Sequence, residues 1–221
     1  GLDDPYSIVF FHTLSNVLQK SKYRNTITGT PEDVNSINLE DVKLVYDAFY
    51  HPENMFLTIT GNFNPYEMAS VVEDNLSKKS FGKYLQPIVI KESEPKKVLE
   101  KYKEERINLT YPRVKICCKM DMNKFKDYSI LELKILSNLI FNINFGATSD
   151  FRDELMEKGL IQGMSVATDI YDDTFVISIS VTTNFKDEVI KRIKDKLNDL
   201  QISDIDFKRK KNATIATLIL D

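Results

Sequence analysis

Few side chains in this sequence are of types that could do chemistry: two histidines, two cysteines and some paired acids. Zinc requires histidine, cysteine or carboxylate ligands that converge, and two ligands on one helix lie three or four positions apart. His12 is followed at those positions by Ser15 and Asn16, and His51 by an amide and a thioether. Neither histidine predicts a metal site. We interpret His12 as a packing residue of an apolar helix and His51 as a helix-end or turn residue.

Cys117 and Cys118 are adjacent in a segment that predicts a strand. Adjacent side chains on a strand point to opposite faces, so we expect neither a disulfide nor a metal pair, and a reduced compartment fits best. No neighbouring histidine or cysteine suggests that either thiol is activated, so we interpret both cysteines as small core or edge residues. Asp172 and Asp173 predict a hairpin turn rather than a general acid and base, because nothing fixes a second partner at working distance.

Two other patterns have a simple structural interpretation. The segment 145–150, FGATSD, lacks the second glycine and the lysine of a phosphate-binding loop, so Ser149 predicts a helix N-cap. The basic run Lys208–Lys211 predicts a solvated helix face.

Composition excludes several classes of partner. Hydrophobic residues make up 42% of the 221 residues, which is enough for a buried core. A net charge of −3 and a pI near 5.6 exclude the basic field that a nucleic-acid binder needs. No apolar run reaches the roughly 18 residues that cross a bilayer, and the N-terminus lacks the order of a signal peptide. We expect a cytoplasmic protein without nucleic-acid or membrane partners.

Hydrophobic periodicity and capping signals predict the elements that must position these residues. Apolar residues at helical spacing predict a buried helix at 5–19 and a helix at 128–141 that is apolar on more than one face. Further helices are predicted after the N-caps Thr30, Asn38, Asn64 and Ser149, and at 185–200 and 204–220. Four β-branched or aromatic segments predict strands of one sheet: 55–61, 113–120, 163–171 and 174–182.

The order of these elements predicts the fold class. Residues 77–103 are polar and rich in lysine, which predicts a long surface connection with one edge strand at 88–90. Residues 131–141 are expected to pack across the sheet. The prediction is an α+β protein with a mixed, largely antiparallel sheet and helices packed mainly on one face.

Three segments, in this order, resemble the insulysin and pitrilysin family of zinc peptidases, in its processing-peptidase branch. They are DDPY at 3–6, the stretch from ITGTPEDV to GNFNP at 27–65, and FGATSDFRDELMEKGLIQGMSV at 145–166. In that family, the phrase around Tyr50, Pro52 and Asn54 marks the passage between two α+β subdomains of one lobe. The resemblance therefore implies that residues 1–50 end the first, zinc-bearing subdomain and that residues 51–221 form the second.

The family's catalytic motif is absent from this sequence. In the family, H-x-x-E-H on a helix supplies two zinc ligands and a general base, and a glutamate shortly before the position of DDP is the third ligand. The chain is therefore expected to begin after the last zinc ligand, with no catalytic residue and no metal ligand of its own; substrate-binding residues are not identified. The second lobe of family members also supplies an arginine and a tyrosine, and in this sequence Met156 and Gln162 stand at about those positions.

The resemblance implies a portion of a zinc-dependent metalloendopeptidase, serving as scaffold and chamber wall for peptide or unfolded polypeptide substrates. The parent protein would bind zinc and work with a second homologous lobe or subunit, whereas this chain alone would bind no zinc and cleave no peptide. An alternative is a catalytically inactive partner or structural subunit of the same fold, which a degraded upstream motif would indicate. A binding module unrelated to peptidases is a third hypothesis, and it requires the three matching segments to be coincidental.

Overall fold

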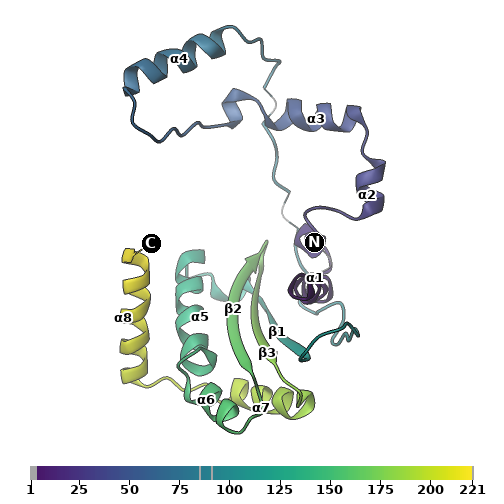
Figure 1. The fold of residues 1–221 in the computed structure, drawn as a ribbon, viewed down its shortest axis with the longest axis vertical. Coiled ribbons are helices and arrows are strands. Elements are labelled where there is room, and N and C mark those ends of the chain that lie inside the picture. The colour runs from purple at the N-terminus through teal and green to yellow at the C-terminus, as the bar shows by residue number, and fades with distance from the viewer. Residues whose placement is uncertain (1–3, 85, 91, 221) are drawn as a thin grey trace. The chain divides into compact units, whose positions relative to one another are not determined.

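The computed structural model describes residues 4–84, 86–90 and 92–220, which fold into two compact units. The sheet unit contains the residues up to Ile27 and those from Glu92 onward. The inserted unit contains Thr28–Ile90. Figure 1 labels the elements of both units.

Each unit is built from several short elements. In chain order, the sheet unit contains α1 (Pro5–Val17), a 3-10 helix (Lys22–Arg24), β1 (Arg113–Asp121), a 3-10 helix (Met122–Phe125), α5 (Ile130–Phe145), α6 (Asp150–Glu157), β2 (Gly163–Tyr171), β3 (Thr174–Thr182), α7 (Lys186–Asn198) and α8 (Asp204–Leu220). The inserted unit contains α2 (Pro31–Ser36), α3 (Leu39–Phe49), a 3-10 helix (Pro52–Asn54) and α4 (Pro65–Ser77). All four predicted N-caps are confirmed, because each side chain accepts a hydrogen bond from a backbone N–H of the first turn.

Three strands in the described part of the chain form one antiparallel sheet in the order β1-β3-β2. In the central strand, Ile179 is paired with Ile116 on β1 and with Val166 on β2. The predicted turn at Asp172 and Asp173 joins β2 to β3, and Asp172 has a φ of 53°, the left-handed conformation that tight hairpin turns require. These elements confirm the predicted α+β architecture.

The strands predicted at 55–61 and 88–90 are wrong. Neither segment forms a strand, and the side chains of Met55, Phe56 and Leu57 are 55%, 91% and 68% exposed. A strand needs a neighbouring strand to satisfy its backbone N–H and C=O groups, and the three-stranded sheet belongs to the other unit. The described residues between α4 and β1 form no helix or strand.

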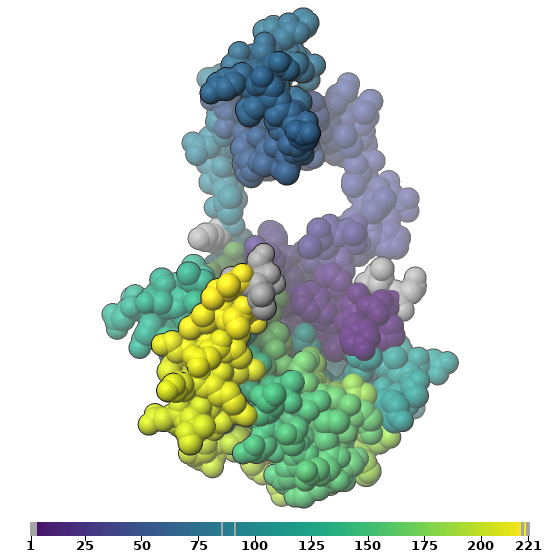
Figure 2. All heavy atoms as spheres, turned by 60° about the vertical axis from the view of Figure 1, so that its left-hand side comes forward, coloured from purple at the N-terminus to yellow at the C-terminus, as the bar shows by residue number. Residues whose placement is uncertain are grey.

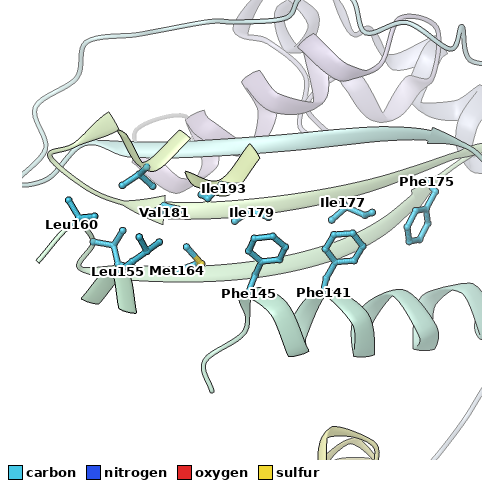
Figure 3. Packing of buried hydrophobic residues seen from close by; sticks show 12 residues of the cluster. Phe141, Phe145, Leu155, Leu160, Met164, Phe175, Ile177, Ile179, Val181 and Ile193 are labelled. Atoms are coloured by element: carbon cyan, nitrogen blue, oxygen red, sulfur yellow. The ribbon is translucent and has the colours of Figure 1, made fainter. Parts of the chain in front are cut away.

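The larger core lies between the sheet and α5. Alternate residues of β3, from Phe175 to Val181, point toward this face and are buried. Figure 3 shows Phe141 and Phe145 of α5 directed at these strand residues. Leu155 of α6 and Ile193 of α7 complete the cluster. The prediction that α5 packs across the sheet is therefore confirmed.

The opposite face of the sheet carries α1. Its Leu14 and Val17, together with the following Leu18, are buried against Val176 of β3. The alternation of strand side chains also separates the two cysteines: Cys118 packs at the edge of the larger core, and its neighbour packs with the α1 cluster. The predicted divergence of the two thiols is confirmed.

Helix α5 has a second neighbour, α8, on the side that faces away from the sheet. This agrees with the sequence of α5, which is apolar on more than one face. Figure 2 shows α8, in yellow, on the surface of the sheet unit. Ile205 of α8 is 80% exposed and Ile219 is 77% exposed, so α8 itself is covered on one side only.

The inserted unit has no core among its described residues. None of them is buried. Helix α3 is amphipathic, yet Leu39, Val42 and Tyr46 on its apolar stripe remain 67%, 53% and 60% exposed. An uncovered stripe of this kind is unusual for a folded domain, because burial of apolar surface is what stabilises an amphipathic helix.

Candidate functional site

The two histidines do not form a site with each other. His12 Nδ1 lies 2.9 Å from the Glu105 carboxylate at the surface of the sheet unit. His51 belongs to the inserted unit: its Nδ1 accepts a hydrogen bond from the Glu53 N–H at 3.2 Å, and its Nε2 lies 3.1 Å from the Gly82 carbonyl oxygen. His51 thus caps a short 3-10 helix, as predicted for a turn residue. Within the described residues, no group of three or more histidine, cysteine or carboxylate side chains converges on one point.

The cysteine thiols are kept in their unreactive form. Burial raises the pKa of Cys117 to about 11 and also raises that of Cys118. Both thiols are therefore protonated near neutral pH, and the thiolate is the form that acts as nucleophile or metal ligand.

The remaining sequence candidates lie on separate elements. Met156 is 39% exposed near the end of α6. Gln162 is exposed immediately before β2, and its N–H donates to the Thr182 carbonyl at 2.9 Å. Ser149 caps α6, so segment 145–150 is a helix start. The basic run 208–211 lies on α8, where Arg209 pairs with Asp206 at 2.9 Å.

A buried ion pair that the sequence did not reveal holds the sheet unit together at one point. Lys119 Nζ lies 2.8 Å from the Glu94 carboxylate, and the two side chains are 3% and 0% exposed. The carboxylate also accepts backbone N–H groups of three successive residues, Gln19 at 3.0 Å, Lys20 at 2.6 Å and Ser21 at 2.5 Å. A buried carboxylate with this many donors is fully hydrogen-bonded.

The ammonium group of Lys119 is equally well satisfied. Besides Glu94, it donates to the Val17 carbonyl at 3.0 Å and to the Lys97 carbonyl at 3.4 Å. Val17 is the last residue of α1, where unpaired carbonyls and the helix dipole favour a positive charge. The three N–H bonds of the lysine are thus used in holding α1 and the segment around residue 97 to β1.

The segment that carries Glu94 is hydrogen-bonded to other parts of the sheet unit at both of its ends. Asp173, in the β2–β3 turn, accepts the Glu94 N–H at 3.1 Å and the Ser93 hydroxyl at 3.2 Å. Further along, the N–H groups of Leu99 and the next residue donate to the Asn16 carbonyl at 2.8 and 3.1 Å. We call residues 93–100 the strap.

The charges of this cluster are matched. Burial would raise the pKa of Glu94, but the N–H of Gln19, the Lys119 ammonium and the next two backbone N–H groups outweigh it and hold the pKa at about 2. A pocket of about 110 Å³ lies beside the pair, and one of its lining residues, Lys96, lies 3.3 Å from the Asp121 carboxylate. Clefts that hold small molecules measure about 300–1,000 Å³. The cluster is therefore suited to joining segments of chain rather than to binding a ligand.

One signal in the sequence indicates part of this cluster. Lys119 interrupts an apolar strand between Cys118 and Met120, at a position whose side chain must point toward one face of the sheet. A buried lysine requires a partner, but Glu94 lies in a polar stretch among several acids, and nothing distinguishes it from them.

Two other basic residues, on the same face of β1 as Lys119, contact α1. The Arg113 guanidinium lies 3.3 Å from the ring centre of Tyr6, and Lys115 Nζ lies 5.1 Å from that of Phe10. Together with Lys119, they attach α1 to β1 near the beginning, the middle and the end of the helix.

A family model and a curated relative both connect this chain with peptidases. Residues 36–214 match the family described as the inactive domain of M16 peptidases. The uncharacterized zinc protease YmfH of Bacillus subtilis is 32% identical over 162 residues, which cover 72% of this chain and 37% of that protein. The chain therefore spans less than half the length of this relative.

Solved structures show the same fold. An M16-like peptidase from Alicyclobacillus acidocaldarius has a TM-score of 0.79 and 25% identity, over 99% of this chain and 52% of that one. A protease from Helicobacter pylori has a TM-score of 0.69 and 16% identity, over 98% and 53% of the two chains. A chain of complex III2 from Candida albicans has a TM-score of 0.62 and 18% identity, over 99% and 53%. None of the helices among the described residues is long and apolar enough to cross a membrane.

Proposed function

Because this chain belongs to the M16 peptidase family, through the part described as its inactive domain, we propose that it is a scaffold portion of a zinc-dependent metalloendopeptidase. In this proposal, the chain forms part of the wall of a chamber that encloses peptides or unfolded polypeptides. The relative named as a zinc protease supports a peptidase parent. Zinc would be bound by residues of the parent protein outside this chain.

The observation that carries the proposal is the extent of the structural match. Nearly the whole chain, 99%, superimposes on about half of an M16-like peptidase. This indicates that the two units of the chain are parts of a larger peptidase architecture. The uncovered apolar stripe of α3 supports the same conclusion, since a larger protein can cover it.

The histidines and cysteines of this chain do not fit a zinc site. His12 is paired with Glu105, and His51 is hydrogen-bonded within its own turn. Both cysteine thiols have raised pKa values, which disfavours the thiolate that zinc would require. We therefore assign to this chain no step of peptide hydrolysis.

The division into subdomains is part of the proposal. Residues 1–50 would end the zinc-bearing subdomain, and residues 51–221 would form the second subdomain of the same lobe. A second homologous lobe or subunit would face this one. A cytoplasmic location is also proposed, and it is supported by two cysteines that lie on opposite faces of the sheet and cannot pair with each other.

A second candidate function is that of a catalytically inactive partner subunit. Met156 and Gln162 stand at about the positions where the family resemblance calls for an arginine and a tyrosine, which fits such a subunit and fits equally a zinc-bearing lobe whose partner supplies that pair. Neither a thioether nor an amide can replace the charge of an arginine at a substrate carbonyl.

Cleavage of a fluorogenic peptide by the parent protein and by residues 1–221, assayed side by side, tests the proposal. We expect cleavage by the parent that a chelator abolishes and zinc restores, and no cleavage by the chain alone. A parent protein without chelator-sensitive cleavage would replace the peptidase proposal with the inactive-partner proposal. Chelator-sensitive cleavage by the chain alone would refute both.

A further inference from the structure

The chain leaves the sheet unit after Ile27 and returns to it before Glu92. The departing segment includes residues 19–21, and the returning segment includes the strap. Glu94, on the returning segment, accepts the N–H groups of the departing one. Both connections to the inserted unit are thus attached to the sheet unit through one carboxylate.

We propose that Glu94 and Lys119 form a clamp that fixes both connections of the inserted unit, so that the two are held or released together. The clamp joins three parts of the sheet unit: the end of α1, the strap and the C-terminal part of β1. It therefore sets the two fixed points between which residues 28–90 are inserted.

The energetics of a buried pair make this clamp cooperative. When one partner of a buried ion pair is removed, the other is left charged and uncompensated, and relieving that state requires access of water. The strap and residues 19–21 supply most of the groups that hydrogen-bond to the pair, so full hydration of the remaining charge displaces them. Loss of either side chain should therefore loosen both connections.

Two connections that are anchored independently would not be released together. If each were anchored independently, removal of the Glu94 side chain would free residues 19–21, whose N–H groups it accepts, while the strap would stay held by its bonds to Asp173 and Asn16. The hydrogen bonds of the strap to Asp173 and Asn16 would likewise persist when Lys119 is removed. Exchange of individual amide protons distinguishes the two cases.

Hydrogen–deuterium exchange on residues 1–221 tests the clamp with the variants Glu94→Gln and Lys119→Met. In both variants, we expect the amides of residues 19–21 and of residues 99–100 to exchange at least about tenfold faster than in the unsubstituted chain. The amides of β3 lie in the core and should accelerate only as far as the overall loss of stability requires, so they should remain much better protected than both connections. Lys96→Met is the matched control, because Lys96 lies in the same strap but its side chain is 79% exposed, and it should change none of these rates.

An exchanged pair, E94K combined with K119E, adds a stricter test. It keeps one charge of each sign but places an ammonium group beside three N–H donors, so both connections should exchange as fast as in the single variants. Acceleration of one connection only, or of neither, would overturn the clamp. So would loss of protection in β3 down to the level of the two connections, which would make Glu94 and Lys119 part of the global fold, and so would full protection in the exchanged pair.

Discussion

The ammonium group of Lys119 lies 2.8 Å from the carboxylate of Glu94, and together they close the point where α1, β1 and the strap meet. Between the strap and the start of β1, residues 101–112 form no helix or strand. An ion pair of this kind is costly to break and so has measurable consequences.

Replacement of Lys119 by methionine should lower the free energy of unfolding by about 3–5 kcal/mol, because the Glu94 carboxylate would be left buried without its cation. Urea denaturation followed by circular dichroism measures the change. The control Lys96→Met removes a pair with Asp121 in which the lysine side chain is 79% exposed, and it should cost less than about 1 kcal/mol. Similar losses in the two variants would contradict the assignment of Lys119 as a buried partner.

The Glu94 pair should also lose its effect in acid. The pKa of Glu94 falls from an ordinary 4.5 to about 2 in the folded chain, so its stabilisation is complete above about pH 4.5 and is lost as the pH falls toward 2. The difference in unfolding free energy between the unsubstituted chain and Glu94→Gln should therefore shrink across this window.

One acid near Glu94, Asp121, has a lowered pKa in both proteins of that comparison, because it accepts hydrogen bonds from Asn123 and lies beside Lys96. Its contribution cancels to first order in the difference between the two proteins. A difference that stays constant from pH 6 down to about pH 2 would contradict the lowered pKa of Glu94.

Both cysteines should resist thiol reagents in the folded chain. Burial raises the pKa of Cys117 to about 11, which leaves well under 1% thiolate at neutral pH. A chromogenic disulfide reagent should therefore react slowly at pH 7 and rapidly with both thiols in urea. Rapid reaction of one thiol per folded chain would show that a cysteine is exposed and activated.

Gly159 and Gly146 should respond differently to alanine. Gly159 ends α6 with a φ of +67° and open space around its Cβ position, so Gly159→Ala should cost about 1–2 kcal/mol from backbone strain alone. A Cβ at Gly146 would lie 2.4 Å from the Asn142 carbonyl oxygen, so Gly146→Ala must displace the end of α5 and should cost more. Gly163→Ala is the control, with open space and no positive φ. Thermal denaturation ranks the three, and equal costs would contradict these backbone assignments.

Local signals predicted the elements of the sheet unit well. The caps at Ser149 and Thr30 are encoded in a few consecutive residues, and the alternation in β3 follows from one face being buried. The strand predicted at 55–61 failed because a strand depends on a partner that local composition cannot supply. Glu94 escaped prediction for a similar reason, since its partners are distant in sequence and its neighbours are ordinary polar residues.

In the candidate site, too, local sequence predicted what depends on one element but not what depends on contacts between distant segments. That Cys117 and Cys118 diverge follows from strand geometry alone, and it was predicted. Which carboxylate neutralises Lys119 depends on how the strap crosses the end of α1, a tertiary contact that no periodicity encodes.

The metal content of residues 1–221 and of the parent protein, measured by mass spectrometry after dialysis against metal-free buffer, tests the central claim most directly. A catalytic zinc needs three converging protein ligands, and none of the described histidine, cysteine or carboxylate side chains gather in a group of three. The account predicts about one zinc per parent chain and much less than one for residues 1–221 alone. One tightly bound zinc per chain in residues 1–221 would contradict it.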